Sequence, residues 1–411
     1  MPTPKHLRLR TEDPDNILWP HIGLLSNYLA QGRYHDTRRR KYIASALHFG
    51  EWLAAESIMP ERMDENSIRR FITEHLVTCS CDHKTPHSVI VMRAALNHLL
   101  RVLKANGVVR NTEPSETDGE IARFDEKMLK VWGLSKDTRR HRCAIIRRLL
   151  DAHGYSNAAG IAWLKPTGLR NFVMGAEPRK PATIRSIAGA VRCYLRYRAI
   201  IGDHVRHLER AIPTPTFRPA AELPQGLTPS ELQQLLASFV TTDRNQRRAY
   251  AIVRCLADLG LRSLEVVRLT LDDIDWENGI INVPATKTRR RDIMPLPTST
   301  GEAIADYLIN ERPATEQREI FVRHVAPVGR PVGRRVVQKA LHAAYRRLGW
   351  QHTRVHILRH TIASVLANDG VPLKQIADVM RHRSVVTTAG YARVDTVRLS
   401  AVALPWPGEI A

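Results

Sequence analysis

The sequence predicts a mainly α protein with a small β component. Apolar residues recur at helical spacing through the first half of the chain, whereas the second half mixes such patterns with two short extended segments. Between the halves, residues 211–226 carry four prolines, which fit neither a helix interior nor a central strand. We therefore expect an N-terminal helical domain at residues 1–110, a second helical domain at 120–210 and an α+β domain at 222–411.

Four helices are expected in the first domain, around residues 24–29, from Asp36 onward, at residues 67–76 and at residues 89–103. Residues 111–119 are polar and rich in turn formers, which predicts a linker. The second domain is expected to hold helices around residues 145–150, 169–173 and 181–200.

A weak internal repeat connects the two helical domains. Residues 25–39 and 124–140 each contain a short helix that ends at glycine, then a threonine followed by two arginines. In both, a longer amphipathic helix comes next. Coincidence between two generic helical hairpins explains the match equally well, so both interpretations remain open.

The third domain opens with a clear helix signal. Thr228 supplies an N-cap, Pro229 suits the first helical position, and Glu231 completes a capping box. Two strands are expected at residues 279–283 and 292–296, on either side of a basic turn. Helices are expected at residues 249–259, 264–269, 302–309, 336–348, 356–368, 373–380 and 385–390.

Positive charge dominates the composition, with 62 Lys and Arg against 41 Asp and Glu and a net charge of +21 at pH 7. Such a surplus favours a nucleic acid partner, because each neutralised phosphate releases counterions; an unrelated basic protein is the alternative. No segment has the roughly 18 apolar residues of a membrane span, and the N-terminus lacks a signal-peptide core. The 5 cysteines are odd in number and scattered, which suits a reducing cytosol. We expect a soluble, cytoplasmic protein.

Several residues of the third domain have side chains suited to one phosphodiester. His356 and Arg359 are three positions apart, so an imidazole and a guanidinium share one helix face. Arg262 lies at a turn between two expected helices, and Lys287 lies on the expected hairpin. Taken singly, each residue has an ordinary structural explanation. The same holds for His382 and for Tyr391, nine residues after it.

Taken together and in order, these residues form a recognisable set. Residues 260–266, GLRSLEV, resemble the first-arginine motif of the tyrosine recombinases of the phage integrase type. Residues 356–361, HILRHT, resemble that family's His-x-x-Arg-His motif, and Lys287 is placed like its hairpin lysine. His382 and Tyr391 match its terminal motif in residues and spacing. The resemblance covers residues 227–394, and the region at 120–210 resembles, less specifically, the family's helical core-binding DNA-binding domain.

The resemblance implies a site-specific recombinase or integrase that cleaves and rejoins DNA strands. Tyr391 would attack phosphorus to give a 3′-phosphotyrosyl link, and Lys287 would protonate the departing 5′ oxygen. Arg262, Arg359, His356 and His382 would bind the phosphate oxygens, with His356 favoured as the base for Tyr391. Glu265 is interpreted as a supporting residue. No cofactor, ATP or catalytic metal is expected.

The resemblance also implies partners. Four protomers, identical or related, would assemble on two double-stranded DNA sites and exchange strands through a Holliday junction, as in the movement of a mobile element. The layout is similar to recombinases found as tandem trios in such elements. Residues 395–411 could pack on a neighbouring protomer; the alternative is a tail that docks on its own domain or frays. The expected DNA-binding residues are Arg38, Arg39, Arg139, Arg140, Arg289, Arg290 and Arg291.

Three other functions fit parts of the pattern. A type IB topoisomerase could use the same catalytic residues, and a non-catalytic DNA-binding accessory protein could keep the fold but would lack a catalytic residue. A basic RNA-binding protein is disfavoured because the aromatic residues are scattered.

One cluster stands apart from the recombinase motifs. Cys79, Cys81, His83 and His87 could bind zinc, but the Cys-x-Cys spacing is tighter than usual and there is a single knuckle. A polar loop between helices is the interpretation that the sequence favours, and no metal site is predicted.

Overall fold

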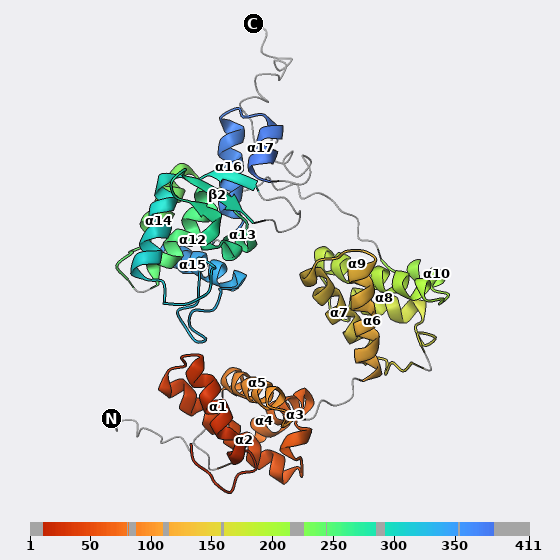
Figure 1. Ribbon diagram of the computed structural model, residues 1–411. Helices are drawn as coiled ribbons and strands as arrows, with labels where there is room; N and C mark the ends of the chain where they lie inside the picture. Colours follow the sequence, from red (N-terminus) through yellow and green to blue (C-terminus); the bar gives the residue numbers. More distant parts are fainter. Residues whose placement is uncertain are drawn as a thin grey trace. The chain divides into compact units, whose positions relative to one another are not determined.

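The computed structural model describes residues 11–79, 81, 88–109, 115–157, 160–213, 226–243, 245–284, 292–351 and 354–381 (Figure 1). It confirms a mainly α protein with one small sheet. The chain divides into two compact units. One is Lys104–Pro219, and the other comprises Met1–Leu103 with Ala220–Ala411. The proposed division into three domains stays a prediction.

The N-terminal helices pack around their own apolar side chains. The bounds are α1 Trp19–Gln31, α2 Asp36–Ala55, α3 Glu65–Arg70, α4 Leu76–Thr78 and α5 Val89–Ala105. Helix α1 packs on α2, and large side chains such as Leu25, Phe49 and Phe71 are fully buried. The helix predicted at residues 67–76 is interrupted, because Phe71–His75 form a π-helical turn between α3 and α4.

The unit Lys104–Pro219 contains five helices among its described residues: α6 Glu116–Lys130, α7 Lys136–Asp151, α8 Pro166–Met174, α9 Pro181–Ile200 and α10 Arg206–Glu209. The prediction of a linker at residues 111–119 is wrong at its end, because α6 begins at Glu116. Ser115 accepts the backbone N–H of Asp118, whose carboxylate accepts the backbone N–H of Ser115. This capping box starts a helix in residues that are polar enough to resemble a turn.

A buried carboxylate holds the ends of this unit together. The carboxylate of Glu120, in α6, is fully buried and accepts hydrogen bonds from the hydroxyls of Tyr194 and Tyr197 at 2.8 and 3.3 Å. The guanidinium of Arg198, also buried, donates to it at 2.8 Å. Burial alone would raise the pKa of Glu120, but Arg198, Tyr194 and Arg123 lower it overall. The charge therefore persists in the core because it is paired.

The two helical regions share helix order as well as sequence. The turn between α1 and α2 and the turn between α6 and α7 both read Gly-x-x-x-Asp-Thr-Arg-Arg, at residues 32–39 and 133–140. In each, the aspartate pairs with the second arginine, Asp36 with Arg39 at 3.1 Å and Asp137 with Arg140 at 2.8 Å. This agreement in sequence, helix placement and ion pair favours a real repeat over coincidence.

The C-terminal region is α+β, as predicted. Its helices are α11 Pro229–Ala237, α12 Gln246–Asp258, α13 Ser263–Arg268, α14 Thr298–Asn310, α15 Arg334–Arg347, α16 Ile357–Asn368 and α17 Leu373–Val379. The antiparallel sheet contains β1 Ile274–Asp275, β2 Ile280–Val283 and β3 Asp292–Pro295, in that order. The two expected strands are confirmed as β2 and β3, and β1 adds a short third strand. The capping box at Thr228 and Glu231 also forms.

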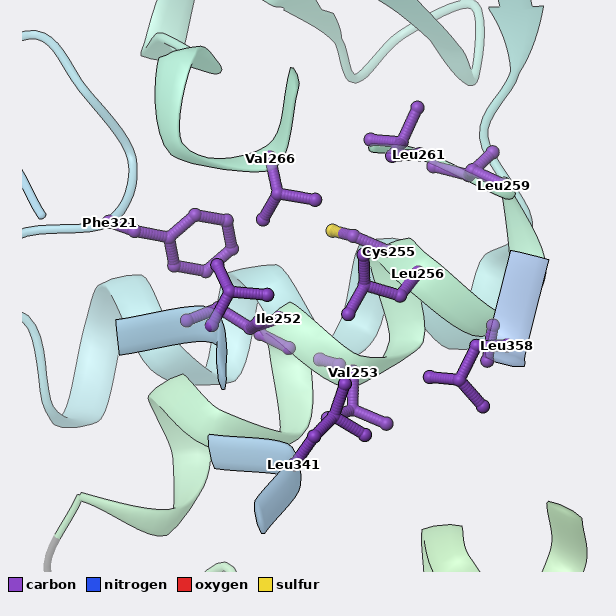
Figure 2. Close-up of a cluster of buried hydrophobic side chains, with 14 of the residues drawn as sticks. Ile252, Val253, Cys255, Leu256, Leu259, Leu261, Val266, Phe321, Leu341 and Leu358 are labelled. Atoms are coloured by element: carbon purple, nitrogen blue, oxygen red, sulfur yellow. The ribbon is translucent and has the colours of Figure 1, made fainter. Parts of the chain in front are cut away.

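Helix α12 is the centre of this region, since α11, α13, α14, α15 and α16 all contact it. Figure 2 shows its side chains Ile252, Val253, Cys255 and Leu256 among Val266, Phe321, Leu341 and Leu358, all buried. The helix expected at residues 385–390 lies outside the described residues. Across the part of the chain that the structure does describe, no helix combines the length and apolar character needed to cross a bilayer.

The Glu120→Gln variant tests the buried network. It leaves Arg198 buried without its counter-charge, so we expect the unit Lys104–Pro219 to lose about 3–5 kcal/mol of unfolding free energy. Calorimetry of the full chain would show one transition moving to lower temperature. The control is Glu126→Gln, which removes an exposed pair with Lys130 and should leave that transition in place. Equal transitions for Glu120→Gln and wild type would refute the role given to this carboxylate.

Candidate active site

Arg262 is presented by the tight turn between α12 and α13. Gly260 has φ +58°, a left-handed conformation that glycine adopts without strain. Arg262 then caps α13, and its backbone N–H donates to Oε2 of Glu265 at 2.8 Å. Its guanidinium donates to Oε1 of Glu265 at 2.6 Å and to the carbonyl oxygen of Arg381 at 2.8 Å. Two hydrogen bonds therefore fix the guanidinium and a third fixes the backbone of this residue, which remains partly exposed.

Arg359 and His356 come from the start of α16, which packs against α12. His356 is the N-cap residue, and Arg359 lies in the first turn with only 6% of its surface exposed. The guanidinium of Arg359 donates to the carbonyl oxygen of Gly260. Two arginines far apart in sequence therefore meet at one turn.

Arg381 is a residue that the sequence analysis did not identify. Its guanidinium is buried, and Nη2 donates to the carbonyl oxygen of Gly260 at 3.1 Å and to Oε2 of Glu265 at 3.2 Å. Its position directly before His382 was the available signal, but arginines at positions 381 and 383 flank that histidine, so sequence alone does not distinguish them. In the structure, Arg381 connects the end of α17 to the turn that carries Arg262.

The positive charges at this site lower the pKa values of two neighbouring groups. Burial lowers the pKa of His356, and the positive charges of Arg359 and Arg262 lower it further. Burial alone would raise the pKa of Glu265, but Arg381 and Arg262 reverse this and lower it. At neutral pH His356 is therefore a neutral imidazole, able to accept a proton, and Glu265 is a carboxylate.

The structure brings together three of the predicted catalytic residues, Arg262, His356 and Arg359, with Glu265 beneath them. Lys287 falls in the segment between β2 and β3, at residues 285–291, which lies outside the described residues along with Arg289, Arg290 and Arg291. His382 and Tyr391 also lie outside them. The roles of these residues stay predictions.

The arginines predicted to bind DNA in the helical regions differ in how they are held. Arg38 and Arg140 are exposed, whereas Arg39 and Arg139 are partly buried. Arg139 donates to the carboxylate of Asp125 at 2.6 Å, so its charge already has a protein partner. Arg39 and Arg140 are paired with Asp36 and Asp137 in the same way, so the exposed Arg38 is the strongest of the four candidates for a phosphate contact, which stays a prediction.

The comparisons with known proteins agree with the motifs found at this site. Residues 225–398 match the model of the phage integrase family. The Sinorhizobium fredii protein "Putative integrase/recombinase y4rA" is 30% identical over 404 residues, covering 96% of both chains. The tyrosine recombinase XerC of Azotobacter vinelandii is 30% identical over 265 residues, covering 62% of this chain and 86% of XerC. The chain belongs to the tyrosine recombinase family.

A solved structure supports the same assignment at the level of the fold. The site-specific recombinase XerH, bound to a palindromic difH substrate in a post-cleavage complex, resembles this tyrosine recombinase with a TM-score of 0.51. The match covers 84% of this chain and 98% of XerH at 16% identity. It therefore shows a common fold.

The pKa of His356 offers a direct test of the site. A nearby positive charge disfavours the imidazolium form, so removing the charge of Arg262 with Arg262→Gln should raise the pKa of His356 toward its usual value. Titration by NMR of the His356 ring proton would measure it. The control is Arg268→Gln, an exposed site at the end of α13, which should leave the pKa unchanged. A pKa that does not rise in Arg262→Gln would show that the charge of Arg262 does not act on His356.

Proposed function

We propose that this tyrosine recombinase cuts and rejoins double-stranded DNA at specific sites through a covalent bond to Tyr391. The observation that carries the proposal is the meeting of Arg262 and Arg359 at the turn formed by Gly260, with His356 near enough for both charges to lower its pKa. This arrangement concentrates fixed positive charge and a neutral imidazole around one point, as an anionic phosphate requires. Lys287, His382 and Tyr391 complete the set in sequence.

A phosphodiester resists attack because its anionic oxygens repel nucleophiles. Arg262 and Arg359 would hold the two non-bridging oxygens and stabilise the charge that accumulates in the transition state. Since the protein already fixes both guanidiniums, little reorganisation is needed when DNA binds. Glu265 and Arg381 act through these arginines, by positioning them.

The proposed proton transfers use His356 as the base and Lys287 as the acid. Neutral His356 would take the proton of the Tyr391 hydroxyl as a bond forms between the tyrosine oxygen and phosphorus. The bond from phosphorus to the 5′ oxygen breaks, and Lys287 would give that oxygen a proton. A 5′-hydroxyl from another strand can then attack the 3′-phosphotyrosine and regenerate Tyr391. The covalent link conserves the bond energy, so the cycle consumes no ATP.

The partner proposed is a pair of double-stranded DNA sites. A net charge of +21 supports binding of a polyanion along a long contact. Four protomers, from this chain alone or with related recombinases, would hold the two sites while strands exchange through a Holliday junction. Movement of a mobile genetic element is the process that we propose it serves.

A nicked suicide duplex carrying a candidate site tests the nucleophile. Cleavage next to the nick releases a short strand that cannot return, so the wild-type protein should accumulate a covalent adduct stable in SDS. Tyr391→Phe lacks the attacking oxygen and should give none. Tyr250→Phe is a matched control, because that partly buried tyrosine of α12 keeps its ring contact with Phe239 as phenylalanine, and it should give the adduct. An adduct of equal yield from Tyr391→Phe would place the nucleophile elsewhere.

A supercoiled plasmid and a synthetic Holliday junction, each carrying the site, separate recombination from the topoisomerase alternative. A recombinase joins the cleaved end to a strand from a second defined site, whereas a type IB topoisomerase reseals its own strand and has no need of a second site. Joined products of defined ends, and resolution of a synthetic Holliday junction carrying the site, support recombination. Relaxation of supercoils without any such product supports the alternative.

Replacing either catalytic arginine should reduce DNA cleavage far more than DNA binding. Arg359→Ala or Arg262→Ala should abolish detectable cleavage, because each removes a group that stabilises transition-state charge. Each also removes only one of many phosphate contacts, so affinity for the duplex should stay within about tenfold of wild type. Arg268→Ala, at an exposed position of the same helix as the Arg262 cap, should leave cleavage unchanged. A parallel loss of binding and cleavage would contradict this division.

A further inference from the structure

A second cluster of reactive side chains lies among the N-terminal helices, with no part in the proposed strand chemistry. Nε2 of His48, Nε2 of His75, Sγ of Cys79 and Sγ of Cys81 all lie within 4.8 Å of one another. The two nitrogens are 3.2 Å apart. His48 Nε2 lies 3.4 Å from Cys79 Sγ, and His75 Nε2 lies 3.7 Å from Cys81 Sγ.

These separations are those of a tetrahedral metal site. With Zn–N bonds of about 2.0–2.1 Å and Zn–S bonds of about 2.3 Å, two nitrogens lie about 3.3 Å apart, and a nitrogen and a sulfur about 3.6 Å apart. The measured distances of 3.2, 3.4 and 3.7 Å agree with this geometry. Hydrogen bonding alone is a poorer explanation, because one atom, His48 Nε2, faces both His75 Nε2 and Cys79 Sγ, and a neutral imidazole nitrogen carries at most one hydrogen.

The local backbone explains how four residues reach one point. His48 lies within α2, and His75 is the last residue of the π-helical turn Phe71–His75. Cys79 follows four residues after His75, across the single turn α4, so the two side chains lie on one face. Such π-helical turns are rare and often mark functional positions. Here the π-helical turn directs the side chain of His75 toward His48.

The surroundings favour a closed structural site. The ring of Phe71 lies against both imidazoles, with centroids 5.2 Å from each. His48 is buried and the other three residues are more exposed. Four protein ligands fill a tetrahedral shell, which leaves no open position for a substrate. Two imidazoles with two thiolates suit zinc better than calcium or magnesium, which take oxygen ligands.

We propose that His48, His75, Cys79 and Cys81 bind one zinc ion that fastens α2 to the segment after α4. This differs from the sequence-based interpretation of a polar loop without metal. It also changes the ligand set considered there, because His48 and His75 take the places given to His83 and His87, which lie outside the described residues. The ion would act on the stability of the N-terminal helices, independently of cleavage.

Metal analysis of the full chain tests this proposal. Protein purified with a phosphine reductant, without chelators or immobilised metal, should contain about one zinc per chain by mass spectrometry. Cys81→Ser changes an exposed residue, so the fold should survive while the zinc content falls below about a tenth of wild type. The matched control is Cys143→Ser, a free thiol of the other unit, which should keep its zinc.

Cobalt substitution gives a second readout, which reports the geometry and the ligands of the bound ion. Wild-type protein reconstituted with Co²⁺ should show the intense visible bands of tetrahedral coordination together with thiolate-to-cobalt charge transfer in the near ultraviolet. Cys79→Ser should weaken the charge-transfer band, and Cys143→Ser should not. Folded, reduced wild-type protein that contains no zinc and shows only the weak bands of octahedral Co²⁺ would overturn the proposal. Zinc at wild-type content in Cys81→Ser would also overturn it.

Discussion

Two acceptors, the carbonyl oxygen of Gly260 and the carboxylate of Glu265, hold three guanidiniums at one place. Arg359 and Arg381 donate to the carbonyl, and Arg262 and Arg381 donate to the carboxylate. Three like charges repel one another strongly where water is partly excluded, so they need fixed acceptors. One carboxylate offsets only part of that charge. The remaining positive charge is available to an anionic ligand. Glu265 supports that site by holding Arg262 and Arg381 in place.

The hydrophobic core positions these three arginines. Each follows directly after an apolar residue that is almost fully buried: Leu261 before Arg262, Leu358 before Arg359, and Met380 before Arg381. A buried residue fixes the direction of the next side chain, because the backbone between them has little freedom. Leu261 and Leu358 belong to the cluster built on α12, and Met380 to a small neighbouring one. A substitution that disturbs the packing of that core would therefore displace the guanidiniums even where the domain stays folded. This sensitivity is expected of a preorganised site.

The sequence predicts a feature of this structure well where residues close together in the chain determine that feature. Periodicity and capping residues place α9 and α11 well, and the order of motifs identifies Arg262, His356 and Arg359. The start of α6 was missed because the residues that cap a helix are also those that form turns. Arg381 was missed because nothing local separates it from the neighbouring basic residues. The partnership of Cys79 with His48 joins residues 31 positions apart, and only the packing of α2 against the π-helical turn brings them together.

The two helical regions share a turn sequence but differ in the polar contacts of their interiors. Both have a turn with the sequence Gly-x-x-x-Asp-Thr-Arg-Arg, and one arginine of the final pair is exposed in each, Arg38 or Arg140. Their interiors differ: Glu120 with Arg198 ties α6 to α9, whereas His48 lies with His75 and two cysteines between α2 and the π-helical turn. Small helical regions bury little apolar surface, so a polar or metal link contributes a large share of their stability. The same turn sequence therefore recurs beside two interiors of different chemistry.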